Sequence, residues 1–337
     1  MRTSLLLGSF VLASLSASVS GCDEVAKAID ANNNQPGEAD GRAVELAKLP
    51  QRLANIAADA NEIFIVAENG DILKRPRSDA NVAPVKVGGY ARGVTYDGIR
   101  AHLDAESLYW NDNSTVNRMP RAGGAVEKLA DVYSAGMAFS ADAIFVSSKD
   151  QKSLLKIDKK TKAVSDLATG FSLLVDMVAD GDRVIVVDRE GETITAVSMA
   201  DGTKTDLAKN QSRPYTIGLG PDHVYWGNGV LSDANKAVED KIYRLKKDGS
   251  GQPEPLVSTA GAQVNQIVAD AQFLYYGRSC GGLHRSPVTG GEGGKFLNAA
   301  AQDFVLSDTS VLVMEDNGCR FDEAAKNQPN RLLSVTK

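Results

Sequence analysis

The chain has 337 residues, of which 43% are hydrophobic and 24% are charged, a composition typical of a globular protein with a large core. Its net charge of −6 argues against nucleic-acid binding, which needs a basic patch or a high isoelectric point. Beyond the N-terminus no apolar run reaches about 18 residues, so the sequence predicts no internal membrane span.

Residues 1–21 are predicted to be an export signal, with Arg2 as the positive start and an apolar segment after it. The end of this signal, from Val19 to Cys22, resembles a bacterial lipobox, although that pattern prefers Leu where Val19 stands. The resemblance implies cleavage before Cys22 and a diacylglycerol on its thiol, which would anchor the chain without a transmembrane helix. The alternative is an ordinary secretory signal followed by a chance cysteine.

Residues 22–40 are polar and poor in large apolar side chains, which predicts a flexible tether. The folded domain is then expected to cover residues 41–337. We expect an exported, monomeric bacterial membrane lipoprotein that faces the periplasm or the cell surface.

From residue 41 onward the sequence repeats, and each repeat contains an apolar, β-rich segment behind a short polar lead-in. Seven such segments occur at intervals of about 41 residues, namely 58–66, 103–110, 139–147, 179–187, 220–226, 269–276 and 307–314. Each is preceded by one short apolar strand and followed by two more, with turn residues between them. Four short strands per repeat predict an all-β, seven-bladed β-propeller.

Two of the repeats carry the pairs Tyr109-Trp110 and Tyr225-Trp226, each followed by a turn and a strand. In this they resemble the repeats of YWTD-type propellers, especially secreted bacterial ones. The Thr-Asp of that motif is replaced by Asn111-Asp112 and Gly227-Asn228. The resemblance therefore implies the architecture and carries over no ligand site.

The last repeat is incomplete, because the chain ends after its third strand. The missing outer strand matches residues 43–49, which resemble the outer strands of other repeats. We predict that this N-terminal strand completes the last blade and so removes an open edge between the two ends of the ring. The alternative assigns residues 43–49 to the tether.

The sequence has three cysteines. If Cys22 is acylated, Cys280 and Cys319 remain, and an oxidising compartment favours their pairing as a disulfide. They follow equivalent strands of neighbouring repeats. Metal ligation and a redox pair are the alternatives, but two cysteines alone make a poor zinc site.

The turns between second and third strands define a face that we call the top face. Third strands and the turns after them, which lie toward the opposite face, are rich in Arg and Lys. The two faces are therefore predicted to differ in charge. The alternative is that these charged side chains only keep the turns solvated. Residues proposed to contact a partner on the top face are Asp112, Asp188, Glu190, Asp233, Glu239, Asp240, Arg278, Glu315, Asp316 and Arg320.

A second candidate site lies in the central channel. The inner strands are expected to place there Arg100, His102, Asp176, Asn265 and Asp303. Arg100, His102 and Asp104 alternate on one side of a strand that faces either the channel or the packed interior. No catalytic residue is assigned, and no spacing typical of a metal site occurs; calcium is conceivable but has no motif.

The sequence therefore favours a non-catalytic envelope lipoprotein that binds a protein or glycan through its top face. One alternative is a metal-dependent lyase or hydrolase that uses His102 in the channel. Another is a sensor of a small ligand.

Overall fold

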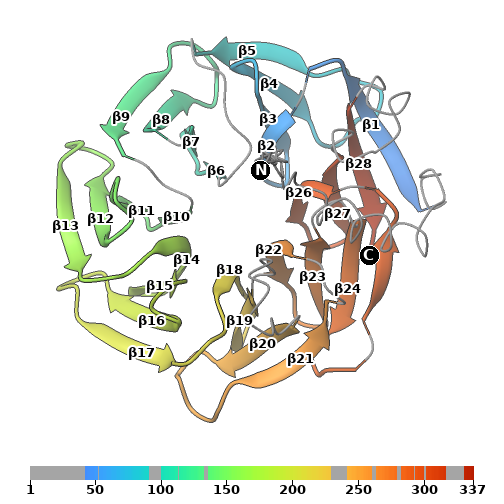
Figure 1. Ribbon diagram of the computed structural model, residues 1–337. Coiled ribbons are helices and arrows are strands. Elements are labelled where there is room, and N and C mark those ends of the chain that lie inside the picture. Colours follow the sequence, from blue (N-terminus) through green and yellow to red (C-terminus); the bar gives the residue numbers. More distant parts are fainter. Residues whose placement is uncertain are drawn as a thin grey trace, which may run out of the picture. The chain divides into compact units, whose positions relative to one another are not determined.

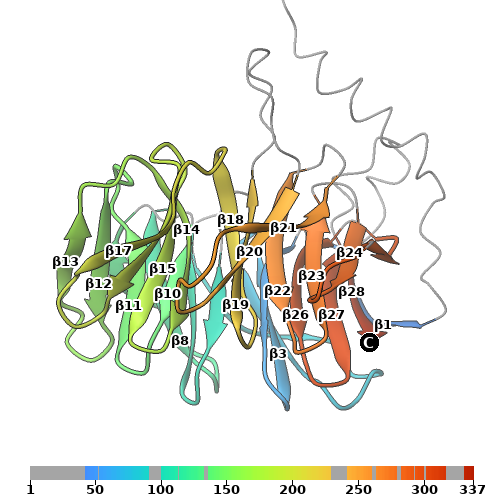
Figure 2. The same ribbon diagram turned by 90° about the horizontal axis from the view of Figure 1, so that it is seen from below.

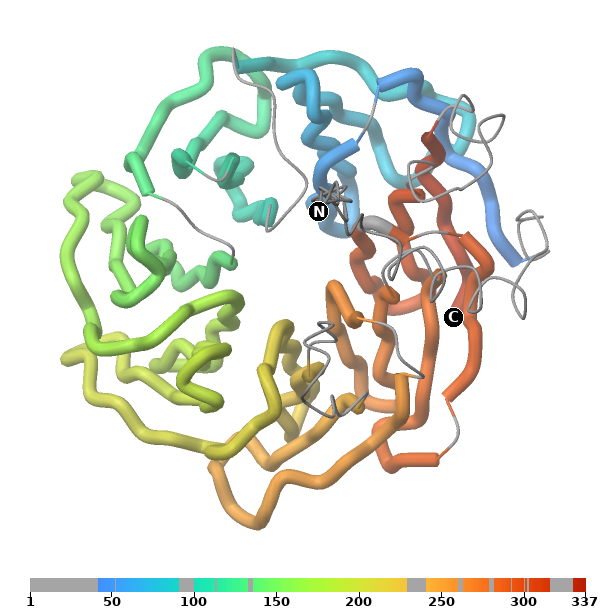
Figure 3. The backbone as a smooth tube through the Cα atoms, viewed as in Figure 1, coloured from blue at the N-terminus to red at the C-terminus, as the bar shows by residue number. Residues whose placement is uncertain are grey.

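The structure is a computed structural model that describes residues 42–51, 53–90, 100–112, 114–132, 136–228, 241–259, 263–278, 282–291, 293–299, 301–315 and 330–337, and only the backbone of Gln302. All of them belong to one compact unit, Ala39–Lys337. They form strands and no helix, arranged as seven four-stranded antiparallel sheets around a common axis (Figures 1 and 3). The predicted seven-bladed β-propeller is confirmed.

Blades are numbered here from the first inner strand, and their strands are given from the axis outward. Blades 1 to 3 consist of β2 (Leu53–Ala58), β3 (Glu62–Ala67), β4 (Asp71–Pro76) and β5 (Val85–Gly89); β6 (Ala101–Leu103), β7 (Ser107–Asn111), β8 (Thr115–Pro120) and β9 (Glu127–Asp131); and β10 (Met137–Phe139), β11 (Ala143–Ser147), β12 (Ser153–Asp158) and β13 (Val164–Thr169).

Blades 4 to 6 consist of β14 (Leu174–Asp180), β15 (Arg183–Asp188), β16 (Thr193–Ser198) and β17 (Lys204–Ala208); β18 (Pro214–Leu219), β19 (His223–Asn228), β20 (Lys241–Lys246) and β21 (Glu254–Ser258); and β22 (Val264–Ala269), β23 (Phe273–Arg278), β24 (Gly282–Pro287) and β25 (Gly294–Leu297). Blade 7 has β26 (Ala301–Leu306), β27 (Ser310–Glu315), β28 (Asn330–Thr336) and, outermost, β1 (Ala43–Leu49).

The predicted closure of the ring is confirmed by blade 7. Strand β1 pairs antiparallel with β28, from Ala43 opposite Val335 to Leu49 opposite Asn330. This pair has a register shift between Glu45 and Ala47, and the outer strand pairs of the other six blades carry a similar shift. The N-terminal strand therefore occupies the same place as every other outer strand.

The core lies between blades and not within them. Each of the seven apolar clusters combines side chains from two neighbouring blades; Ile56 and Ile63 of blade 1, for example, pack with Leu332 of blade 7. The second strand of each blade is almost entirely buried, whereas outer strands such as β13 are mostly exposed. A single blade therefore has no core of its own, and the ring is expected to fold as one cooperative unit.

Because neighbouring strands are antiparallel, the strand ends and the turns between them lie on two opposite faces of the ring (Figure 2). Inner strands begin, and second strands end, on the top face. The turn from first to second strand and the turn from third to fourth strand lie on the opposite side, which we call the bottom face.

Candidate functional site

The inner strands share an irregularity near the top face. Five of them have a register shift close to their first residue. The residue that follows the shift occupies the same position relative to the second strand in each of these blades. Pairing to the second strand assigns the equivalent positions in the other two blades as well. The resulting ring of seven positions, which we call the axial ring, consists of Asn55, Arg100, Gly136, Asp176, Thr216, Gln266 and Asp303.

Several axial-ring side chains connect one blade to the next. Amide and carboxylate oxygens accept from the backbone N–H of the following inner strand, at 2.8 Å for Ala101 N to Asn55 Oδ1, 3.1 Å for Ile217 N to Asp176 Oδ2 and 2.8 Å for Ile56 N to Asp303 Oδ2. Gln266 pairs with both the N–H and the C=O of Phe304, at 3.0 Å each. Polar residues on these inner strands thus join blades in the structure.

Arg100 differs from the rest because it reaches past a whole blade. Its Nη2 atom, on blade 2, lies 3.5 Å from Asp176 Oδ2 on blade 4. Burial alone would lower the pKa of Arg100, but Asp176 and Asp303 more than offset that effect and raise it. Blade 3 makes room with Gly136, where a Cβ atom would lie 2.7 Å from Asp176 Oδ1. A charged network therefore forms near the axis.

Asp303, a carboxylate of this network, has a raised pKa. Its side chain is buried, and burial raises its pKa to about 6, against hydrogen bonds from the backbone of Ile56 and Phe304 and the charge of Arg100. Its proton therefore responds to mild changes of pH.

We expect Asp303 to make the protein less stable as the pH rises. Because its folded pKa of about 6 exceeds the ordinary value of 3.8, the folded chain binds this proton more tightly than the unfolded chain does. This tighter binding adds about 3 kcal/mol to the free energy of unfolding at a pH below the pKa of Asp303 in the unfolded chain. The contribution is lost as the pH rises through the pKa of Asp303 in the folded chain. Denaturant unfolding of wild type and Asp303→Asn from about pH 4 to about pH 7 measures this.

His102 contributes in the opposite sense, so only the difference between wild type and Asp303→Asn isolates the aspartate. Burial and the charge of Lys159 lower the pKa of His102 to about 4, so its contribution is lost as the pH falls. A wild-type advantage over Asp303→Asn that stays constant or grows with pH would contradict the assignment to Asp303.

The structure separates His102 from the other channel candidates. Its ring stacks on Phe139 of blade 3 with centroids 4.0 Å apart. Asp104, on the same side of the chain, pairs with Lys159 at 3.2 Å. Asn265 does not share the axial-ring position; its Nδ2 atom lies 3.4 Å from the carbonyl of Ala301. Of the five predicted channel residues, Arg100, Asp176 and Asp303 thus form one network.

The predicted top-face contacts divide into structural and accessible residues. Asp112 is buried and accepts hydrogen bonds from the backbone of Ser114 at 3.1 Å and of Thr115 at 2.7 Å. Asp188 is buried and accepts from the backbone of Ser172 and Leu173 at 2.8 Å each. Both carboxylates build turns and are not available to a partner, which corrects the prediction for these two residues.

Glu315 is also unavailable, since it is fully buried and paired with Arg331, with Nη2 to Oε1 at 3.0 Å. Glu190 is accessible, with 49% of its side chain exposed beside Arg189 and Arg213. Arg278 is buried at the end of β23. The other predicted contacts (Asp233, Glu239, Asp240, Asp316 and Arg320) and all three cysteines, Cys22, Cys280 and Cys319, lie outside the described residues.

The bottom face shows a repeated inter-blade ion pair, which we call the clasp. Seven equivalent residues follow the third strands and donate their backbone N–H to the first turn of their own blade: Arg77, Arg121, Lys159, Met199, Lys247, Val288 and Lys337. In blades 2, 3, 5 and 7 the cation pairs with an aspartate that starts the first turn of the preceding blade, as Lys247 does with Asp180 at 3.0 Å and Lys337 with Asp270 at 2.8 Å.

In two blades both members of the clasp are replaced, whereas blade 1 keeps Arg77 although blade 7 has Ser307 at the aspartate position. Where Met199 and Val288 replace the cation, the preceding blade has Ser140 and Gly220 in place of the aspartate. Many of the cations predicted to form a basic face therefore pair with carboxylates of the same face. The bottom face is a seam between blades, and the prediction of two oppositely charged faces does not hold for the clasp residues.

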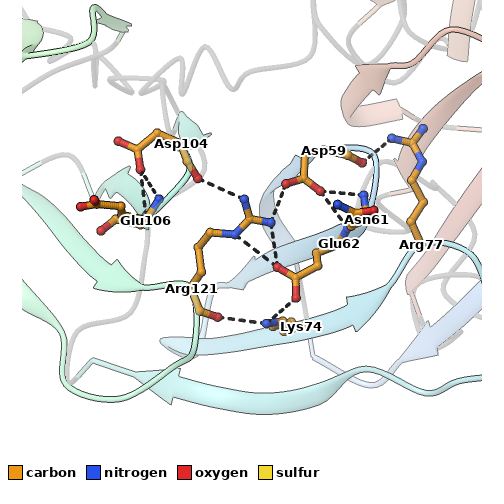
Figure 4. A network of polar contacts seen from close by, with 9 residues as sticks. Asp59, Asn61, Glu62, Lys74, Arg77, Asp104, Glu106 and Arg121 are labelled. Atoms are coloured by element: carbon orange, nitrogen blue, oxygen red, sulfur yellow. Dashed lines mark hydrogen bonds and ion pairs between the residues drawn. The ribbon is translucent and has the colours of Figure 1, made fainter.

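The clasp of blades 1 and 2 is the most extensive (Figure 4). Arg121 Nη2 lies 2.7 Å from Glu62 Oε2 and also pairs with Asp59. Burial would raise the pKa of Asp59, but hydrogen bonds from the backbone of Asn61 and Glu62 and from Arg121 outweigh it and lower the pKa.

Arg121→Met is expected to lower the free energy of unfolding by about 1–2 kcal/mol, because Asp59 loses its cation and Glu62 keeps only Lys74 at a partly solvated site. Methionine is the residue that the chain itself uses at the equivalent Met199. Urea denaturation measures the loss, and the exposed Lys160→Met is the control, with no change expected. Equal stability of the two variants would exclude a contribution from the clasp.

Comparisons with known proteins show the fold. No family model matches the chain, and no curated protein matches it. Solved structures do: the streptogramin B lyase structure has a TM-score of 0.65 and 12% identity over 87% of this chain and 97% of that chain. The Neurospora crassa Pan2 WD40 domain gives 0.62 and 9%, over 89% and 98%. U3-55K gives 0.67 and 11%, over 90% and 100%.

At these low sequence identities the similarity shows that the chain shares the propeller fold, and it shows nothing beyond the fold. Sequence reasoning missed the axial ring itself, because Gly136, Thr216 and Gln266 share no residue type. What identifies them is their position in the repeat, because each stands at the same register position opposite the buried second strand of its blade.

Proposed function

We propose that this chain is a non-catalytic binding module of the bacterial cell envelope. In this proposal a diacylglycerol on Cys22 anchors it, residues 23–40 form the tether, and loops of the top face bind a protein or glycan. Propeller neighbours such as the WD40 domain are compatible with a binding role. In the described part of the chain, no helix is long and apolar enough to cross a membrane.

The observation that carries the proposal is the position of the chain ends in the ring. Ala43 pairs with Val335 near the end of β28, and Lys337 pairs with Asp270 on the bottom face. The folded domain therefore begins on the bottom face of blade 7. A tether that enters there leaves the top face directed away from its point of attachment.

The channel residues support a binding role better than the lyase alternative. A general base must reach its substrate and carry the right protonation state. His102 is stacked on Phe139, and the carboxylates of Asp176 and Asp303 are engaged by backbone N–H groups and by Arg100. No group of three metal-ligating side chains occurs among the residues that the structure describes.

Site-specific photocrosslinking on intact cells tests the proposal. We expect crosslinks to a discrete partner from the exposed top-face positions Asn69 and Lys149, and none from the exposed bottom-face positions Asp142 and Lys160. Crosslinks from both faces alike would argue against top-face binding.

Mass spectrometry of the mature protein should show an acylated Cys22, and a different N-terminus would contradict the anchor. The Cys280–Cys319 disulfide also stays a prediction.

A further inference from the structure

Two arginines on the top face share one carboxylate oxygen at the junction of blades 4 and 5. Arg189 lies in the turn between β15 and β16, and Arg213 lies in the connection from β17 to β18. Arg189 Nε is 3.2 Å and Arg213 Nη2 is 3.5 Å from the same atom, Glu190 Oε1. The two guanidinium groups therefore flank a single oxygen, and the three side chains together carry an excess of positive charge.

Most of the hydrogen-bonding capacity of these guanidinium groups is unused. A guanidinium has five N–H donors, yet within the described part of the chain each of the two side chains bonds only to Glu190. For Arg213 this single contact is long, and its Nε atom is buried without a partner. Both side chains nevertheless reach solvent, since 22% of Arg189 and 21% of Arg213 is exposed.

The backbone that carries the two arginines is held in place by hydrogen bonds. Arg189 N donates to the carbonyl of Leu173 at 2.9 Å, and Gln211 N donates to the carbonyl of Glu192 at 2.9 Å. The side chain of Gln211 in turn accepts from Nε1 of the fully buried Trp226 at 2.9 Å. The turn and the connection are thus tied to each other and to the packed interior, so a ligand would have little ordering left to pay for.

Arg213 also has an unfavourable backbone conformation. Its φ is 48°, in the left-handed region, although it directly precedes Pro214, and residues before proline favour extended conformations. Glu192 and Asn210, with φ values of 56° and 55°, lie in the same two segments. Left-handed residues other than glycine are concentrated at ligand sites, which supports a binding role for this junction.

We propose that Arg189 and Arg213 form a recognition site for an acidic side chain of a protein partner. Glu190 shows that a carboxylate fits between the two guanidinium groups, and 49% of its side chain is exposed, so it can be displaced. A carboxylate of the partner would accept charge-assisted hydrogen bonds from N–H groups that the chain itself leaves unused. Arginine is also enriched in interfaces between proteins. This inference rests on the proposed function and specifies the chemistry of its partner.

Glu190 has the role of an internal competitor in this site. It occupies one position of the two guanidinium groups in the free chain, and its charge repels a carboxylate that binds beside it. Neutralising Glu190 should therefore strengthen binding, whereas neutralising either arginine should weaken it. An ion pair that only stabilises the loops would give no gain of affinity when Glu190 is neutralised.

A random dodecapeptide display library, selected on the purified full-length mature chain, tests the site. We expect the recovered peptides to be enriched in Asp or Glu. Synthetic copies should bind Arg189→Gln and Arg213→Gln about tenfold more weakly than wild type, because each variant loses charge-assisted hydrogen bonds. They should bind Glu190→Gln about two- to fivefold more tightly, as expected for one exposed like charge. Lys149→Gln, which removes another exposed top-face cation, is the matched control and should bind like wild type.

The gain expected for Glu190→Gln keeps the test independent of folding, because a misfolded variant cannot bind more tightly. Peptides without acidic enrichment, no recovered binder, equal binding by the arginine variants, or unchanged or weaker binding by Glu190→Gln would each overturn the site. Binding of uronate-containing glycans in place of peptides, lost in the same arginine variants, would overturn the assignment to a protein partner. The photocrosslinking result would still decide independently whether the top face contacts a partner.

Discussion

Removal of residues 42–50 from the mature chain is expected to abolish the folded state. This segment contains β1, whose Leu46 and Leu49 are 8% and 5% exposed and pack between blades 7 and 1. The carbonyl of Leu46 also accepts a hydrogen bond from the buried Arg75. Two leucines contribute about 3–6 kcal/mol, and the open edge of β28 favours aggregation. The total stability of a domain is about 5–15 kcal/mol.

Two controls make this result specific, with soluble yield and urea denaturation as the measurements. Deletion of residues 23–40 should leave the unfolding free energy within about 1 kcal/mol of wild type, because these residues are predicted to be tether. Within β1, Leu49→Ala should cost about 2–4 kcal/mol, while Val44→Ala, at a side chain that is 52% exposed, should cost almost nothing. Equal losses from both deletions would contradict closure by β1.

Asp176→Ala is expected to be the most damaging single substitution at the axis, with a loss of about 3–5 kcal/mol in unfolding free energy. The carboxylate accepts from Met177 N at 2.9 Å and from Ile217 N and Thr216 Oγ1 at 3.1 Å each. It also faces Arg100. Alanine would leave two backbone N–H groups and the partly buried Arg100 guanidinium without this acceptor.

The conservative variant Asp176→Asn tests the charge separately from the shape. It retains one acceptor oxygen but removes the negative charge opposite Arg100, so its loss should be smaller than that of Asp176→Ala. Restoring the balance with Arg100→Gln in the Asp176→Asn background should recover part of the stability. Chemical denaturation measures these three variants and the single Arg100→Gln, and a loss in the double variant equal to the sum of the two single losses would exclude the coupling of Arg100 to Asp176.

The repeats made the architecture predictable from sequence. Seven copies of an apolar segment identified the second strands, which proved to be the most buried part of each blade. Because a truncated last repeat needs an outer strand, the resemblance of residues 43–49 to other outer strands also identified the closure, and the bounds of β1 match it.

The chemistry at the strand ends was less predictable, because charge alone does not reveal where a side chain points. Asp112, Asp188 and Glu315 look like surface residues in the sequence because their side chains are charged. Each is nevertheless buried and has hydrogen-bond partners within the propeller. Their partners are backbone N–H groups or distant residues, which periodicity does not show. The clasp, by contrast, left a readable trace, since Met199 occurs together with Ser140.

The position of β1 also determines how the ring would carry mechanical load. A pull on the chain before Ala43, with a partner held at the top face, would act along β1 and therefore parallel to β28. The hydrogen bonds between the two strands lie across that direction. They would be strained simultaneously as a shear load, instead of opening one after another from an end. A disc anchored in this way would resist traction through the same strand that closes it.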